Sequence, residues 1–127
     1  MIGRTIPMPS RGPHFLQLKN EIGKLFTWYE QKKDELHPVE SAALCHFKFV
    51  YIHPFSDGNG RTAGLLMNVI LMKNGYPPAI VKAEDEQRAR YYKTLEMASV
   101  DQNVEPFLEL IAECAENSLN DYLNTIR

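Results

Sequence analysis

The sequence lacks the features that mark several specialised classes of protein. Its 127 residues carry a net charge of −2 and contain no block of Lys or Arg, which disfavours nucleic acid or an anionic membrane as the main partner. No apolar run approaches the ~18 residues that a membrane-spanning helix needs, and the first residues lack the long apolar stretch of a signal peptide. We therefore expect a cytoplasmic chain with no nucleic-acid or membrane partner, although a tether upstream of Met1 would not be visible.

Cysteine is also scarce, since Cys45 and Cys114 are the two in the chain. Both lie among apolar residues at helical spacing, so we interpret them as buried free thiols rather than as a disulfide. Hydrophobic residues make up 44% of the sequence and charged residues 24%, as in ordinary globular proteins. This length and composition predict a single domain with one core.

Apolar residues recur at three- and four-residue steps along most of the chain, and this spacing predicts an all-α fold. Residues 1–14 are the exception, because their three prolines and two glycines favour an irregular or extended arm. The pair His37-Pro38 suits the start of the second helix, and Gly75 before a Pro-Pro pair suits the end of the third. The expected helices cover residues 15–33, 38 to at least 50, 59 or 60 to about 74, 84–99, and 106 to at least 122.

The stretch HPFSDGNGRTAG, residues 53–64, is polar and rich in glycine, unlike the helices on either side of it. Gly58, Asn59 and Gly60 can adopt backbone angles that most residues avoid, so successive amides can point into one concavity and bind an anion. The helix expected to start there adds its positive end. Arg61, in the first turn of that helix, can add a fork of donors suited to phosphate.

Two further side chains of the stretch suit chemistry at a bound phosphate. Asp57 lies beside the anion site, where a carboxylate can hold a divalent cation against phosphate oxygens. His53 precedes the loop and can accept a proton near neutral pH. Base, metal ligand, anion cradle and cationic clamp together predict a phosphoryl- or nucleotidyl-transfer site. Taken singly, each part also has a structural interpretation, as a His-Pro turn, a Gly-Asn-Gly loop or an Asp helix cap.

The same stretch resembles the Fic-family signature, HxFx[DE]GNGRxxR. The similarity continues through ELHPVESAALCHFKFVYIHPF, LLMNVILMKNGYPPAIV and RYYKTLEMAS, and it covers residues 2 to about 123. These segments look most like the Fic AMP-transferases of the animal endoplasmic reticulum and their bacterial relatives. The Doc kinase branch carries Lys after the Asn, where this chain has Gly60.

The resemblance implies a Fic-like helical fold with the active-site loop between two central helices. We expect one domain over residues 1–127, truncated at its N-terminus. Its flap or arm would comprise residues 1–14, and its helical core residues 15–127.

The resemblance also implies transfer of AMP from ATP, with Mg²⁺ as cofactor, to a Ser, Thr or Tyr hydroxyl of a target protein. His53 takes the position of the general base, and Asp57 takes that of the Mg²⁺ ligand. The flap would align the target peptide by strand addition. The residues implied to contact the nucleotide are Ile2, Gly3, Arg4, Thr5, Asp57, Gly58, Asn59, Gly60, Arg61, Thr62, Ala63, Gly64, Tyr91, Tyr92 and Ser99.

Some positions have a second interpretation or no role in the expected site. Tyr91 shares a helical stripe with Leu95 and Ala98, so it also suits the core. Ser99 stands where close relatives have an Asn. His46 lies on an apolar helix face and is given no role.

Gly64 is the main departure from the family pattern, because the second arginine of the signature belongs at this position. That arginine usually holds the γ-phosphate, so we expect loose ATP binding and slow transfer. The family's inhibitory pattern, [ST]xxxE[GN], occurs nowhere in the sequence.

Three functions stay open: a protein adenylyltransferase, a degenerate Fic domain that binds nucleotide or a partner protein, and an enzyme that removes AMP. Relatives need the inhibitory glutamate for the last of these. The sequence names neither the target protein nor the oligomeric state, and a homodimer is among the alternatives.

Overall fold

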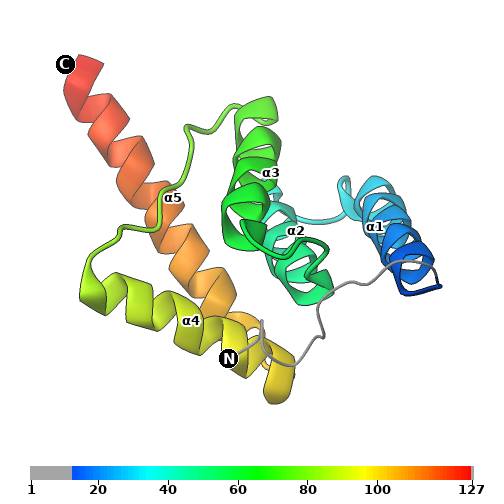
Figure 1. The fold of residues 1–127 in the computed structure, drawn as a ribbon. Coiled ribbons are helices and arrows are strands. Elements are labelled where there is room, and N and C mark those ends of the chain that lie inside the picture. The colour runs from blue at the N-terminus through cyan, green and yellow to red at the C-terminus, as the bar shows by residue number, and fades with distance from the viewer. Residues whose placement is uncertain (1–12, 127) are drawn as a thin grey trace.

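The structure is a computed structural model that describes residues 13–126, and in this range the chain forms helices and no strand (Figure 1). The all-α prediction is therefore confirmed. None of these helices is both long and apolar enough to cross a bilayer. The helices are α1 (Pro13–Lys32), α2 (Pro38–Ile52), α3 (Asn59–Lys73), α4 (Asp85–Val100) and α5 (Glu105–Ile126).

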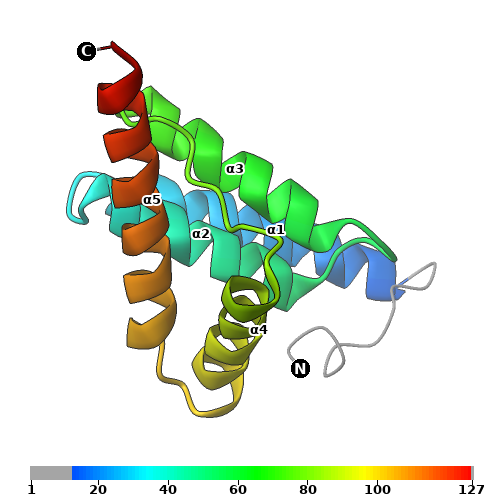
Figure 2. The same ribbon diagram turned by 90° about the vertical axis from the view of Figure 1, so that its left-hand side faces the viewer.

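The central element is α2, which packs against each of the other four helices. In Figures 1 and 2, α3 runs antiparallel beside it, and α4 pairs with α5. The side chains that α2 buries follow the helical repeat expected from the sequence, and two of them are alanines that let neighbouring helices approach closely. The buried residues of α2 are Ser41, Ala42, Ala43, Cys45, His46, Phe49 and Val50.

The start of α2 and the end of α3 form as the sequence predicts, whereas α1 begins at Pro13, inside the expected arm of residues 1–14. Nδ1 of His37 accepts a hydrogen bond from the backbone N–H of Val39 at 3.1 Å, so His37 caps α2 and Pro38 follows in its first turn. At the end of α3, Gly75 has φ +88° and donates its N–H to Met72 O, and Tyr76 N–H donates to Leu71 O at 2.9 Å. This pair of bonds is the Schellman motif that a glycine at this position permits.

Both cysteines are buried and free, as expected. Burial raises the pKa of the Cys45 thiol to about 12 and also raises the pKa of Cys114, because a thiolate loses its hydration in the core. The thiols therefore stay protonated at neutral pH and serve as small apolar side chains.

The apolar stripe of α5 is buried only in its first half. Phe107, Leu110 and Ile111 are fully buried, whereas Leu119 is 37% and Tyr122 is 56% exposed. The second half of α5 extends beyond α4 (Figure 1), so among the described residues it has little to pack against. An amphipathic pattern predicts the helix but not where its partners end.

The glycine that ends α3 gives a test of this architecture. Gly75→Ala should lower the free energy of unfolding by about 1–2 kcal/mol, because φ +88° strains any residue with a Cβ, even though open space surrounds this one. Gly64→Ala is the matched control, since Gly64 lies inside α3 and an added Cβ meets nothing within 4 Å. It should raise the free energy of unfolding by up to ~1 kcal/mol. Urea denaturation measures both changes, and a shift of the same sign in the two variants would contradict the helix end assigned here.

Candidate functional site

The site begins where α2 ends, at His53. This residue has φ 53° and ψ 57°, a left-handed conformation that few non-glycine residues adopt, and its N–H donates to Phe49 O at 3.1 Å. The left-handed residue terminates α2 and turns the chain into the loop of residues 54–58. His53 is thus half-buried and placed at the base of the loop.

Asn59 holds the loop together with its side chain. Its Oδ1 accepts from Phe55 N–H at 3.0 Å, and its Nδ2 donates to Phe55 O at 2.8 Å. The side chain is buried, and these two bonds fix which of its ends carries oxygen. The sequence placed Asn59 among the phosphate-binding residues, but in the structure only its backbone N–H is free to serve a ligand.

The same amide group sets the tautomer of His53. Asn59 Nδ2 lies 3.2 Å from His53 Nδ1 and can only donate, so Nδ1 must offer a lone pair. The neutral ring then carries its proton on Nε2. For Nε2 to accept a proton from a hydroxyl, the ring proton must first move to Nδ1, which ends the contact with Asn59. Substrate binding would have to bring this change about.

The N-terminus of α3 is open to a ligand. Gly58 precedes the helix with φ 81°, and no described side chain caps the first turn, so its N–H groups lack the partners that later turns provide. Asp57 Oδ1 accepts from Gly58 N–H at 2.9 Å. Arg61 folds back over Gly58, so that a Cβ on this glycine would lie 3.0 Å from Nη2. Glycine therefore leaves room both for the turn and for the guanidinium.

Arg61 and Asp57 form a weak ion pair at the surface. Nη2 and Oδ2 are 3.8 Å apart, and the two side chains are 81% and 93% exposed. Exposed pairs of this kind contribute little to stability. Both side chains are therefore available to a ligand at small energetic cost.

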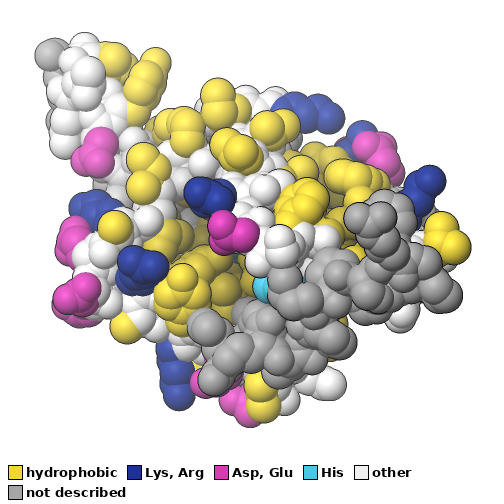
Figure 3. Space-filling view, in the orientation of Figure 1, with side chains coloured by type: hydrophobic (Ala, Val, Ile, Leu, Met, Phe, Trp, Pro, Cys, Tyr) yellow, Lys and Arg dark blue, Asp and Glu magenta, His cyan; other side chains and the backbone are white. Residues whose placement is uncertain are grey.

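This helix end opens into a cavity of about 850 Å³ between α3, the segment of residues 79–83 and α4. Asn68 Oδ1 accepts from Ala79 N–H at 2.9 Å and ties that segment to α3. Figure 3 shows hydrophobic side chains in a hollow on this face of the molecule, with charged side chains beside it. Among the residues expected at the site, the cavity is lined by Asp57, Gly58, Gly60, Arg61, Gly64, Tyr91 and Tyr92.

The tyrosine pair lies on α4, across the cavity from the start of α3. Tyr92 is 40% exposed, and the guanidinium of Arg88 lies 6.0 Å from its ring centre. Tyr91 is half-buried and packs on the core, as its helical stripe predicts, and it also forms part of the wall of the cavity. His46 lines the same cavity, a position that the sequence analysis did not assign. His46 lies two helical turns before His53, and this spacing is the sequence feature from which its place near the site could have been predicted.

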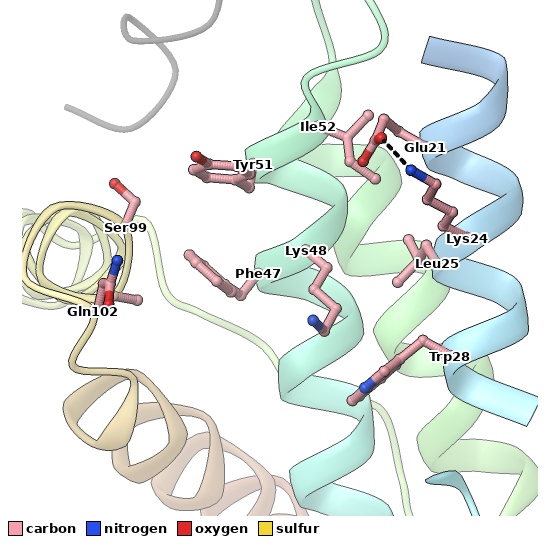
Figure 4. A pocket seen from close by; sticks show the side chains of 11 residues that line it. Glu21, Lys24, Leu25, Trp28, Phe47, Lys48, Tyr51, Ile52, Ser99 and Gln102 are labelled. Carbon is pink, nitrogen blue, oxygen red and sulfur yellow. Dashed lines mark hydrogen bonds and ion pairs between the residues drawn. The ribbon is translucent and has the colours of Figure 1, made fainter. Parts of the chain in front are cut away.

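The other expected residues are not brought to this cavity. Ser99 lies in a separate groove of about 440 Å³ between α1, α2 and α4, which Tyr51 and Phe47 also line (Figure 4). Thr62 and Ala63 are on α3 but do not line the cavity. The flap residues Ile2, Gly3, Arg4 and Thr5 lie outside the described residues.

The donor set suits Mg²⁺ only in combination with a ligand. Within residues 13–126 no group of three or more His, Cys, Asp or Glu side chains could enclose a metal ion. Mg²⁺ is commonly held by one or two carboxylates together with substrate phosphates and water. Asp57, an exposed carboxylate beside the open end of α3, fits that mode of binding.

The chain is similar in sequence to proteins of a known family. The model of the Fic/DOC family matches residues 8–71, about half of the chain. "Protein adenylyltransferase Fic" of Nematostella vectensis is 47% identical over 107 residues, which are 84% of this chain and 24% of that protein. The protein of the same name in Drosophila melanogaster is 52% identical over 88 residues, which are 69% of this chain and 17% of that protein.

Solved structures share the fold. Fic-1 (residues 134–508) of C. elegans superposes with a TM-score of 0.78 and 37% identity, over 85% of this chain and 32% of that one. A Fic-domain-containing signalling protein of Bacteroides thetaiotaomicron gives a TM-score of 0.76 and 30% identity, over 89% and 46% of the two chains. The chain spans a quarter or less of the length of the Nematostella and Drosophila adenylyltransferases. The family match, the identities and the shared fold show that this chain belongs to the Fic/DOC family.

Proposed function

We propose that this chain is a protein adenylyltransferase, which moves AMP from ATP to a Ser, Thr or Tyr hydroxyl of a target protein. The observation that carries the proposal is the N-terminus of α3, which no side chain of the described residues caps and which opens into a cavity walled by Tyr91 and Tyr92. Helix N–H groups and Arg61 suit a phosphate chain, and aromatic rings suit a nucleotide base. The names of the relatives agree with this reaction.

Different residues of the site have different roles in the transfer of AMP. The target hydroxyl oxygen forms a bond to the α-phosphorus of ATP, and the bond from that phosphorus to the pyrophosphate oxygen breaks. The hydroxyl proton passes to Nε2 of His53, once the ring proton has moved to Nδ1, and pyrophosphate leaves. The N-terminus of α3 and Arg61 stabilise the negative charge that builds on the phosphate oxygens.

Mg²⁺ would be held by Asp57 and by phosphate oxygens, and when bound it supplies charge neutralisation of the phosphates. The target peptide would dock on the flap, residues 2–5, which the structure does not describe. The Mg²⁺ site and the docking of the target peptide are further parts of the proposal and are not evidence for it.

A second candidate is a nucleotide- or protein-binding module with little turnover. Gly64 favours it, because this residue lines the cavity and leaves open space where a longer side chain could reach the ligand. Without a donor there, the γ-phosphate has one cation fewer. Removal of AMP is less well supported, since the sequence contains no inhibitory glutamate motif.

His53→Ala tests the role of the base. The variant should slow pyrophosphate release in the presence of a target by roughly 10²–10⁴-fold. Its affinity for ATP should stay within about twofold, since His53 does not line the cavity. Pyrophosphate release at the rate of the unmutated chain would remove His53 from the mechanism.

Asp57→Asn tests the metal. Because Asp57 is 93% exposed, the change should leave the fold intact while it weakens Mg²⁺-dependent ATP binding by roughly tenfold or more. The control is the same calorimetric titration without Mg²⁺, in which the variant should bind ATP at least as well as the unmutated chain. If the unmutated chain binds ATP equally with and without Mg²⁺, Asp57 serves only the turn.

Gly64→Arg tests whether the lack of an arginine at position 64 weakens the binding of ATP. Position 64 lies one turn after Arg61 on the same side of α3, so an arginine there could add a charged hydrogen bond of ~1.5–3 kcal/mol to the γ-phosphate. ATP should bind roughly 10- to 100-fold more tightly, and ADP should gain little. Gly64→Ala, which improves the helix but adds no charge, is the control. Equal gains for the Ala and Arg variants, or for ATP and ADP, would contradict this role for the position.

A further inference from the structure

His46 and Tyr91 form a contact in the wall of the cavity. Nε2 of His46 lies 2.7 Å from the Tyr91 hydroxyl oxygen, and the two rings meet edge to face with centres 5.5 Å apart. His46 is 3% exposed, and both residues line the cavity. The contact therefore fixes where the hydroxyl lies relative to a bound ligand.

Burial also determines how many protons the pair carries. It lowers the pKa of His46 to about 4, so at neutral pH the ring is uncharged and has one N–H. It raises the pKa of Tyr91, so the phenol keeps its proton. Each side chain thus has one proton, and only one of the two can lie between them.

Two arrangements fit the 2.7 Å contact. If Tyr91 donates to Nε2, the ring proton is on Nδ1, which is buried and has no partner among residues 13–126. If the Nε2–H donates to the Tyr91 oxygen, Nδ1 is an unpartnered acceptor instead. Buried N–H groups without a partner are rarer than acceptors without one, which favours the second arrangement.

In the second arrangement the Tyr91 proton is free and close to the anion-binding end of α3. A Cβ on Gly60 would lie 3.6 Å from the Tyr91 oxygen, so the hydroxyl is next to the first turn of the helix. No other described residue forms a hydrogen bond with this hydroxyl. A nucleotide with its phosphates at the helix end would bring oxygen acceptors within reach.

We propose that His46 is a positioning residue, which donates Nε2–H to Tyr91 and so turns the phenolic proton toward an oxygen of the nucleotide in the cavity. The ligand in this inference rests on the proposed function, whereas the tautomer of His46 does not. His46 acts through Tyr91 and does not itself contact the reacting atoms.

Nitrogen NMR of the unmutated chain tests the tautomer directly. The chemical shifts of the two ring nitrogens of each of the four histidines report which one carries the proton. The signals missing from His46→Gln identify those of His46. A proton on Nε2 supports the proposal, and a proton on Nδ1 overturns it, whether or not the chain binds ATP.

ATP affinity tests the consequence for the ligand. Tyr91→Phe should weaken binding roughly two- to tenfold, the effect of one hydrogen bond. His46→Leu should weaken it as much, and the double variant no further, because both changes remove the same donor. His46→Gln, whose amide N–H can reach the position of Nε2, should weaken binding less than His46→Leu.

The control is the thermal stability of each variant. Equal losses in His46→Gln and His46→Leu, or losses that add in the double variant, would mean that His46 provides packing alone, which overturns the proposal. If the unmutated chain binds no ATP, the proposed function fails, and the NMR result alone decides the arrangement of the pair.

Discussion

The candidate site depends on the two hydrogen bonds between the side chain of Asn59 and the backbone of Phe55. They close the loop between α2 and α3, and they hold the first turn of α3 in a fixed position relative to the end of α2. Because the amide is buried, water cannot easily replace Phe55 as its partner. The open N–H groups of α3 and the ring of His53, which the same amide contacts, are positioned together.

The helix α2 positions a second part of the site, the wall of the cavity. Its central packing fixes His46 in the core and His53 at its C-terminal end, two turns apart on one helix. Asp57 and Arg61 are by contrast exposed and weakly paired. The site thus combines a rigid cavity wall with charged groups that can reorganise around a ligand, a division that suits transfer of a highly charged group.

Much of the fold could be predicted because local chemistry decides it. The helical repeat, the Pro at the start of α2 and the Gly at the end of α3 act within one or two turns, and the helices lie where these signals place them. Features set by tertiary packing could not be predicted in this way. The burial of Asn59, the contact of His46 with Tyr91 and the position of Ser99 in another groove each depend on how helices distant in sequence pack together.

The central claim is that the cavity at the end of α3 supports transfer of AMP rather than binding alone. Intact mass spectrometry, after incubation of the chain and candidate target proteins with ATP and Mg²⁺, measures this directly. The account predicts a covalent gain of one AMP on a target or on the chain itself, and no gain with an ATP analogue whose α–β bridge cannot be cleaved. Saturating ATP binding with no adduct on any protein would contradict it.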